Sequence, residues 1–438
     1  MSILSTLTNA IYSIGSTLAG TDPSQYPRAI YRVIVAGQDI SDLLSTRLIS
    51  MSIEDRRGME ADSVSIELSD HDGLLSIPPL NAELQVWIGW SHTGLVYKGK
   101  YFATEVDHSG MPDVLSIRAT SADLKKTLKQ KKERSFSEQS IEDIISTIAG
   151  EHGLIPYTHS DYTAITLPHI DQNESDANLI TRIADEHNAI ATVKNGTLLF
   201  MPKGLSQTVS GLALPTAYIT RSSGDGHRYS KTNGADDISG VTCYYYDPDI
   251  AERQSVTVGD SSKTIKELRH YHRDRDSAYH DARAEYNRIK SKGAVFSINL
   301  AHAMPELIPE MQIDTQGFKD EIDSIVWLGT VVKHTLSASN GYTSDIEAEV
   351  KLPDSDDIAQ LIDDEGGNYT GVIAYYQHGK QTAKVTRGEQ TTPKRLTYLY
   401  KNKKTAETAA QREWTAIQAE QQASQTTDSV DQPTSDST

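Results

Sequence analysis

Alternation of apolar and polar residues marks the first part of the chain. Between residues 30 and 120, every second side chain is apolar in several short runs, and turn-forming residues separate the runs. A strand with one face buried and the other in solvent shows this period of two. We therefore predict short strands that form a sandwich or a barrel. The clearest runs are 31–35, 63–68, 84–88 and 115–119.

Near residue 135 the pattern changes to helical spacing. Isoleucines at 141, 144, 145 and 148 fall on one helix face, and Ser140 with Asp143 resembles a capping box at its start. A second helix is expected after Ser175. Two apolar runs then flank Asn195-Gly196, and Asn-Gly between such runs is a strong hairpin signal. Residues 135–204 are therefore predicted to form a compact α/β unit set into the β framework.

Strand and helix patterns alternate in the remainder of the chain. A strand is predicted at 240–246, a helix near 274–291, and further strands between 294 and 352. An acidic linker follows. Residues 424–438 are rich in Ser, Thr, Asp and Gln, a composition typical of disorder.

The first 20 residues form an uncharged amphipathic stripe. They lack the positive region of a signal peptide, and Ser and Thr interrupt the apolar positions too often for a membrane span. A lone helix of this length is marginal in water, so the stripe must be covered. It packs on its own domain or binds a partner, and both interpretations stay open. The candidate partner-binding positions are Ile3, Leu7, Ile11, Ile14 and Leu18.

A first internal repeat is faint. The pattern Leu-x-x-Glu-(Leu/Met)-Gln-(Val/Ile) begins at Leu80 and again at Leu307. In both places a glycine follows, at Gly99 and at Gly329, and opens a strand. Another alternating strand comes next, around Leu115 and around Ile346. This shared layout indicates duplication of a β unit.

A second repeat is stronger and reads as a hairpin followed by a helix. Gly-Val-x-x-Tyr-Tyr begins at Gly240 and at Gly371, and Val-Thr-x-Gly-(Asp/Glu) begins at Val256 and at Val385. Small residues on the helix allow it to lie close to a sheet. The repeat has no nucleophile or ligand set, so we interpret it as structural. The helix positions Ala278, Ala282, Glu285, Tyr286 and Ile289 return at the same spacing as Ala406, Ala410, Glu413, Trp414 and Ile417.

Composition narrows the function classes. The 438 residues include 60 acidic and 42 basic side chains, for a formal net charge of −18, and a single cysteine. One cysteine makes no internal disulfide and no cysteine-rich metal site. An acidic chain is a poor candidate for wrapping DNA through its phosphates. Hydrophobic residues make up 37%, so much of the surface must be polar or must contact partners.

A basic run stands out on this acidic chain, at the junction between the β framework and the α/β unit. It has neither the stacking aromatics nor a motif of nucleic-acid binding. It is either a solvated junction or a set of salt bridges to another subunit, and it is kept as a candidate partner site. The run comprises Lys125, Lys126, Lys129, Lys131, Lys132 and Arg134.

Motifs for catalysis and cofactors are missing. No phosphate-binding glycine loop and no G-x-S-x-G elbow occurs. His270-x-His272, with Asp274, Asp276 and His280 nearby, offers metal-ligand types, but arginines at 269, 273 and 275 would repel a cation. We therefore predict no metal, no cofactor and no catalytic residue. A hydrolase with paired carboxylates is a minor alternative.

The order of several motifs resembles the late control D family of phage tail proteins. The first is Gln172-x-Glu-Ser-Asp-x-x-Leu-Ile-x-Arg-Ile-Ala-x-Glu-His187, followed by the Asn-Gly hairpin. The others are Gly341-Tyr342 within the strand pair 331–350, preceded by 305–317, and the lysine-rich lead-in and helix at 394–417. The resemblance covers about 26–420.

This resemblance implies a baseplate hub without enzymatic activity, in the virion tail baseplate or a tail-like particle, assembled in the cytoplasm of a bacterial host. It implies a homotrimer whose two tube-like β-barrel domains per chain make a pseudo-hexameric ring between a trimeric spike and a hexameric tube. Further implied partners are the tape measure and baseplate wedge proteins, with no specific nucleic-acid binding and no membrane anchor. No fused lysozyme or needle repeat is seen, so the spike is expected to be a separate chain. Alternatives are the base of a type VI-like secretion spike and a cell-wall hydrolase of the tail.

The predicted fold class is α+β, mainly β. The net charge further suggests an acidic channel that repels DNA. The predicted divisions are 1–25 (amphipathic segment), 26–134 (first barrel), 135–204 (inserted α/β domain), 205–352 (second barrel with the helix near 274–291), 353–423 (C-terminal hairpin-helix repeat) and 424–438 (disordered tail).

Overall fold

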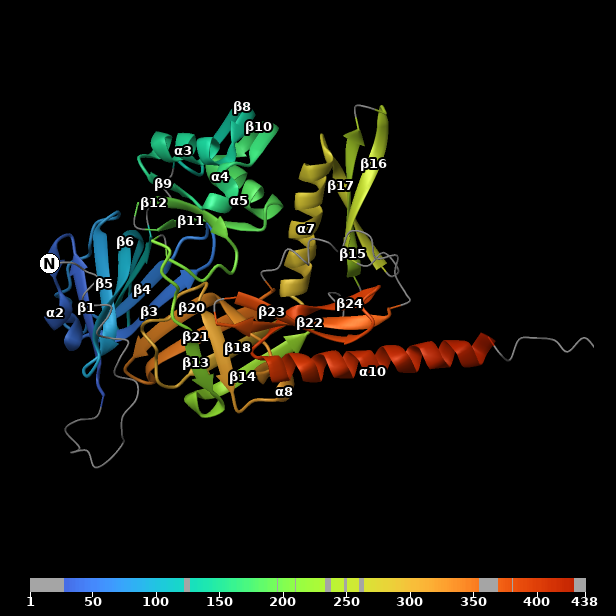
Figure 1. The fold of residues 1–438 in the computed structure, drawn as a ribbon. Coiled ribbons are helices and arrows are strands. Elements are labelled where there is room, and N and C mark those ends of the chain that lie inside the picture. The colour runs from blue at the N-terminus through green and yellow to red at the C-terminus, as the bar shows by residue number, and fades with distance from the viewer. Residues whose placement is uncertain are drawn as a thin grey trace, which may run out of the picture.

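The computed structural model describes residues 27–121, 127–194, 196–208, 210–232, 238–247, 250–259, 264–353, 369–379 and 381–428. It is mainly β, with few helices (Figure 1). Thirteen of the described strands join in one large sheet, a compact α/β unit lies above it, and two small sheets with one helix each lie at its far end. No helix in the described ranges is both long and apolar enough to span a membrane.

The first half of the large sheet follows the predicted alternation. In β4 the residues at 64, 66 and 68 are buried and their neighbours are not, and β7 repeats the pattern. The strands lie in the order β3-β4-β7-β6-β5-β1-β2, antiparallel throughout. The elements are β1 (Ala29–Val35), β2 (Gln38–Asp39), α2 (Ser41–Ser45), β3 (Leu48–Arg56), β4 (Ser63–Ser69), β5 (Glu83–Trp90), β6 (Gly94–Ser109) and β7 (Val114–Thr120).

The second half repeats this strand order. Five consecutive framework strands of the first half lie as β3-β4-β7-β6-β5, and five of the second half lie as β14-β18-β21-β20-β19, with every pairing antiparallel. The faint repeat at Leu80 and Leu307 thus precedes topologically equivalent strands. The elements are β13 (Ala217–Thr220), the 3-10 helix Arg221–Ser223, β14 (Gly224–Lys231), β18 (Ala294–Leu300), β19 (Gln312–Gln316), α8 (Asp320–Asp323), β20 (Trp327–Ser337) and β21 (Gly341–Val350).

The two halves share one open sheet, whereas the sequence predicted two barrels. Strand β20 pairs with β19 only at its start, which leaves residues 331–337 free to pair with β3. Among the described strands, the hydrogen-bonded order is open at both ends and closes no barrel. Two core clusters underlie the halves: the first contains Tyr101 and reaches Ala303 and Tyr342 of the second half, and the second contains Trp327 and extends into the C-terminal hairpin-helix unit.

The α/β unit contains the two helices and the hairpin expected from its sequence, together with three further strands and a short helix. Ser140 accepts a hydrogen bond from the Asp143 backbone and Ser175 accepts one from that of Asn178, so each serine caps its helix. Strands β11 and β12 pair around the Asn-Gly turn, of which Asn195 lies outside the described residues. The elements are β8 (Lys131–Ser140), α3 (Ile141–His152), β9 (Ile155–Thr158), α4 (Ser160–Thr163), β10 (Thr166–Ser175), α5 (Asp176–Glu186), β11 (Ala189–Lys194) and β12 (Thr197–Pro202).

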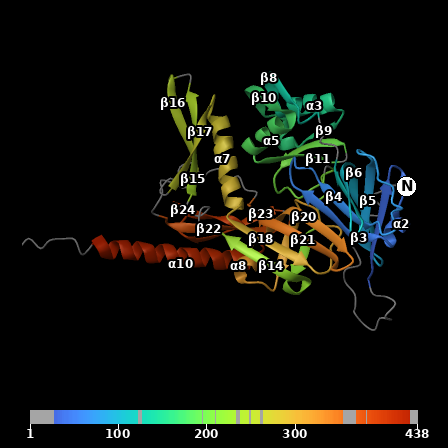
Figure 2. The same ribbon diagram turned by 180° about the vertical axis from the view of Figure 1, so that it is seen from behind.

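The strong repeat produces two units of the same topology, visible from both sides of the molecule (Figures 1 and 2). In each, a central strand pairs antiparallel with the next strand and parallel with the third, and one helix packs on the sheet. The first unit comprises β15 (Ile238–Asp247), β16 (Glu252–Gly259), β17 (Thr264–His272) and α7 (Arg275–Ser291). The second comprises β22 (Gly371–His378), β23 (Gln381–Gly388), β24 (Pro393–Tyr400) and α10 (Lys403–Asp428), which runs five residues into the tail predicted to be disordered.

Side-chain contacts repeat between the two units as well. The ammonium of Lys266 lies 2.5 Å from a Glu285 carboxylate oxygen, and Lys394 contacts Glu413 at the same distance. An aromatic ring, Tyr286 or Trp414, lies on a glycine of the adjoining strand in each unit. The two units are therefore equivalent in detail, which makes position-by-position comparison meaningful.

Candidate functional site

Most of the predicted partner-binding positions have no described structure. The N-terminal stripe from Ile3 to Leu18, and Lys125 and Lys126, lie outside the described residues. Of the remaining lysines, Lys129 and Lys131 are exposed. These positions stay candidate partner contacts.

Lys132, by contrast, is bound within the chain. Its ammonium lies 2.6 Å from carboxylate oxygens of Glu151 and Asp176, and the Arg134 guanidinium contacts the same two residues at 2.5 and 2.7 Å. Asp176 is fully buried at the start of α5 and also lies 2.7 Å from the His152 ring. This part of the basic run therefore fastens β8 to α3 and α5.

The electrostatics of this cluster explain how a buried carboxylate is tolerated. Burial by itself raises the pKa of Asp176. Hydrogen bonds from Gln172, Lys132 and His152, together with the charge of Arg134, outweigh burial and hold the pKa at about 2. Asp176 is thus ionised and fully partnered at neutral pH.

A second buried ionic cluster joins the parts of the molecule. Arg57, just after β3, lies 2.6 Å from both Glu310 and Glu349, which belong to the second half of the sheet. Lys203, at the exit of the α/β unit, lies 3.0 Å from Glu349, and the Gly204 backbone donates to Glu310 at 2.7 Å. This cluster, formed by Arg57, Lys203, Glu310 and Glu349 and called the seam below, therefore links both halves of the sheet and the α/β unit.

The large sheet is hollowed on one face, across the junction of its halves. The hollow has a volume of about 630 Å³ and spans β3, β20, β21, β18 and β14. Three acidic and three basic side chains line it, so its formal charge is balanced. The lining of this hollow does not show the acidic excess of the whole chain. The charged residues are Glu54, Asp345, Glu347, Arg56, Arg228 and Lys333.

The loop between β4 and β5 exposes large apolar side chains. Leu74, Ile77 and Leu80 are 76%, 62% and 60% exposed. The loop is held in place by polar contacts, because Arg47 binds Asp72 through two hydrogen bonds of 2.7 and 2.5 Å. A fixed loop that presents three large apolar side chains is typical of a surface that meets another protein.

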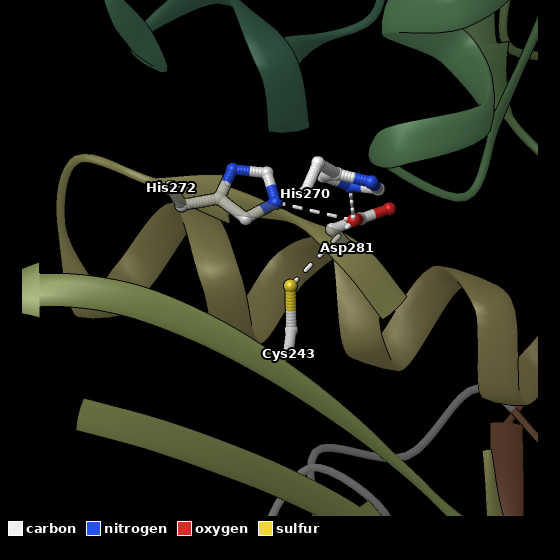
Figure 3. Close-up of side chains that lie close together, drawn as sticks. All are labelled: Cys243, His270, His272 and Asp281. Carbon is white, nitrogen blue, oxygen red and sulfur yellow. Dashed lines mark hydrogen bonds and ion pairs between the residues drawn. The ribbon is translucent and has the colours of Figure 1, made fainter. Parts of the chain in front are cut away.

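The first hairpin-helix unit contains a cluster that the sequence only half indicated. His270 and His272 lie beside Asp281 of α7 and Cys243 of β15 (Figure 3). Two other residues that the sequence placed near these histidines do not join the cluster. Asp274 caps α7, and the His280 ring lies against the His187 ring. Cys243 was missed because it lies 27 positions before His270. Asp281 is only nine positions after His272, and the helical period of α7, which places Asp281 on the face toward the sheet, was the available signal.

Comparisons with known proteins agree with this architecture. The family model described as phage tail baseplate hub (GPD) matches residues 80–340. The chain is 35% identical over 367 residues to a probable baseplate hub protein of Escherichia phage 186, covering 74% of this chain and 93% of that protein. It is 34% identical over 365 residues to the probable baseplate hub protein of Escherichia phage P2, covering 74% and 94%.

A solved structure shows the same fold. The tail protein from Neisseria meningitidis MC58 superposes with a TM-score of 0.56 at 14% identity, covering 74% of this chain and 96% of that one. The family-model match over 80–340 includes the framework strands from β5 to β20, the α/β unit and the first hairpin-helix unit. From the family match and the two phage relatives together, this chain belongs to the phage tail baseplate hub family.

Proposed function

We propose that the chain assembles as a homotrimer whose duplicated β units make a ring of six similar units between the trimeric spike and the hexameric tail tube. The observation that carries this proposal is the strand order β3-β4-β7-β6-β5 repeated as β14-β18-β21-β20-β19. Two equivalent units per chain turn three-fold symmetry into approximate six-fold symmetry. The spike then contacts a three-fold surface and the tube a near-six-fold one.

Supporting this arrangement, the large sheet has one hollowed polar face that crosses both units. We infer that this face lines the channel of the ring. In this proposal the channel wall at the hollow carries balanced charge, in contrast to the acidic lining expected from the net charge. A wall with neither a basic nor an acidic excess neither holds nor strongly repels a passing polyanion.

The apolar loop 70–80 supplies a subunit contact in this proposal. Leu74, Ile77 and Leu80 expose large apolar side chains on a loop that Arg47 and Asp72 fix. Burying them against a neighbouring copy stabilises assembly by about 25 cal/mol per Å² of apolar surface. In this proposal the role is structural rather than catalytic, in keeping with relatives that are named probable baseplate hub proteins. Tape measure and wedge proteins are the further partners proposed.

The test is the mass of the purified chain, alone and mixed with the spike protein of the same tail, measured by light scattering. Three chains of 48.2 kDa, about 145 kDa, are expected once assembled. Ile77→Asp is expected to shift the population toward monomer. Ile155→Asp, at a residue that is 65% exposed on the α/β unit, serves as the matched control and leaves the trimer intact. A stable monomer in the presence of spike contradicts the proposal.

A further inference from the structure

Four metal-binding side chains of three chemical types converge in the first hairpin-helix unit (Figure 3). Their ligand atoms all lie within 4.8 Å of one another. Asp281 is central: its Oδ2 lies 3.8 Å from Cys243 Sγ, 3.1 Å from His272 Nε2 and 2.5 Å from His270 Nε2. Three elements contribute, since Cys243 is on β15, the histidines are on β17 and Asp281 is on α7.

This donor set matches zinc in type and number. Zinc takes four ligands from cysteine sulfur, histidine nitrogen and carboxylate oxygen, in a tetrahedron with bonds of about 2.0–2.3 Å. Ligand atoms of such a tetrahedron are separated by about 3.3–3.8 Å. The Cys243–Asp281 separation already has this value, and the two imidazoles reach it by moves of about 1 Å or less.

Of the three arginines that argued against a cation, Arg269 lies on the same strand as the histidines. Successive side chains of a strand face opposite sides of its sheet, so Arg269 and Tyr271 lie on the face opposite His270 and His272. Tyr271 accordingly contacts the guanidinium of Arg253, which lies over its ring. The cluster itself offers one carboxylate and one thiol, and both are anionic when bound to a metal.

The second hairpin-helix unit is an internal comparison. From the strand registers and the helix repeat, the positions equivalent to the four donors are Ala374, Tyr398, Tyr400 and Ala409. None belongs to the usual zinc ligands. The same sheet and helix thus form without this donor set, so packing of the fold alone does not require cysteine, two histidines and aspartate to meet.

Burial and access fit a structural metal site. Cys243 is fully buried and Asp281 is 8% exposed, so the thiol is shielded from reaction with solvent species. The His270 side chain is 57% exposed and lies at a cavity of about 440 Å³ that α5 and α7 share, which gives a path for entry.

We propose that Cys243, His270, His272 and Asp281 bind one zinc ion per chain, as a structural site that ties β15 and β17 to α7. The site goes beyond the hub role and does not depend on the trimer. Bound zinc stabilises the unit that projects from the large sheet, in place of the alanines and tyrosines that complete the second unit.

The experiment uses the full chain without a histidine tag, under reducing conditions, after dialysis against EDTA. Native mass spectrometry with added ZnCl₂ is expected to show one zinc per chain, and zinc is expected to raise the melting temperature. Co²⁺ in place of zinc is expected to give a sulfur-to-cobalt charge-transfer band. Because Cys243 is the single cysteine, that band reports this site alone.

Cys243→Ala places at this position the residue that Ala374 provides in the other unit. It is expected to lose the cobalt band and to weaken zinc binding at least tenfold. The exposed His270→Ala tests the same site without disturbing the core. His378→Gln, an exposed histidine of the second unit, is the matched control and binds zinc as the parent does. Equal zinc affinity in the parent and in Cys243→Ala, or no zinc at one equivalent, overturns the proposal.

Discussion

Asp176 shows how one residue organises its neighbourhood. It is buried at the first position of α5, where the positive end of the helix favours an anion. Lys132, Arg134 and His152 surround it from β8 and α3. In the sequence the basic residues form a run with no evident partner, and the carboxylate that binds two of its six members, Lys132 and Arg134, lies more than forty positions later.

Acid is expected to weaken this residue's contribution to folding. The pKa of Asp176 is about 2 in the folded chain and 3.8 ordinarily. The stabilisation is therefore complete above pH 3.8 and is lost as pH falls through 2. It amounts to about 2 kcal/mol. Urea unfolding at pH 6 and at pH 2 should show a larger fall in the free energy of unfolding for the parent than for Asp176→Asn. If the free energy of unfolding falls equally in the parent and in Asp176→Asn, the ionised Asp176 does not stabilise the fold as assigned.

At the scale of elements, the duplicated hairpin-helix unit depends on a glycine under an aromatic ring. Gly388 has a φ of +71°, and a Cβ there would lie 2.6 Å from the Thr370 carbonyl oxygen and 2.9 Å from the Trp414 ring. Gly259 has the same relation to Tyr286. The repeated Val-Thr-x-Gly motif therefore encodes close packing of helix on sheet.

Alanine at Gly388 should be far more costly than alanine at a glycine with open space. Gly379 also has positive φ, +61°, but nothing lies within 4 Å of its Cβ position. Gly379→Ala is expected to cost about 1 kcal/mol from backbone strain alone. Gly388→Ala adds the clash and should cost about 3 kcal/mol. Chemical denaturation measures both, and similar costs would show that the ring contact is unimportant.

At the scale of the whole molecule, the seam around Arg57 and the pairing of β3 with β20 hold the parts together. Burial by itself raises the pKa of Glu349, but the charges of Arg57 and Lys203 outweigh it and lower that pKa. The seam joins residues almost 300 positions apart. It therefore ties the two β units together, as the proposed ring of six similar units requires.

Arg57→Ala should leave two buried carboxylates without their main partner. Breaking a buried pair in this way costs about 3–5 kcal/mol. The exposed Arg32, which pairs with Asp39 at the surface, is the matched control, and Arg32→Ala should cost at most about 1 kcal/mol. Thermal unfolding compares the two, and hydrogen exchange should increase in β3 and β20 only for Arg57→Ala. If Arg57→Ala lowers stability no more than Arg32→Ala does, the seam does not have the stabilising role assigned to it.

Much of the fold follows from local pattern. The cap at Ser140, the start of a helix after Ser175 and the strand alternation at 63–68 could be predicted because each depends on neighbours within a few residues. The joining of β3 to β20 was not, because an edge has no sequence signal that names its partner. The two predicted barrels accordingly appear as one open sheet.

By itself, the sequence determined the element types, the two duplications and the family of tail proteins that the chain resembles, because periodicity and motif order are properties of the chain. Only the tertiary structure decided which distant groups meet: Cys243 with Asp281, Lys132 with Asp176, and Arg57 with Glu349. Side-chain chemistry at such sites depends on separations of a few ångströms, and those are set by packing between elements that the linear order does not specify.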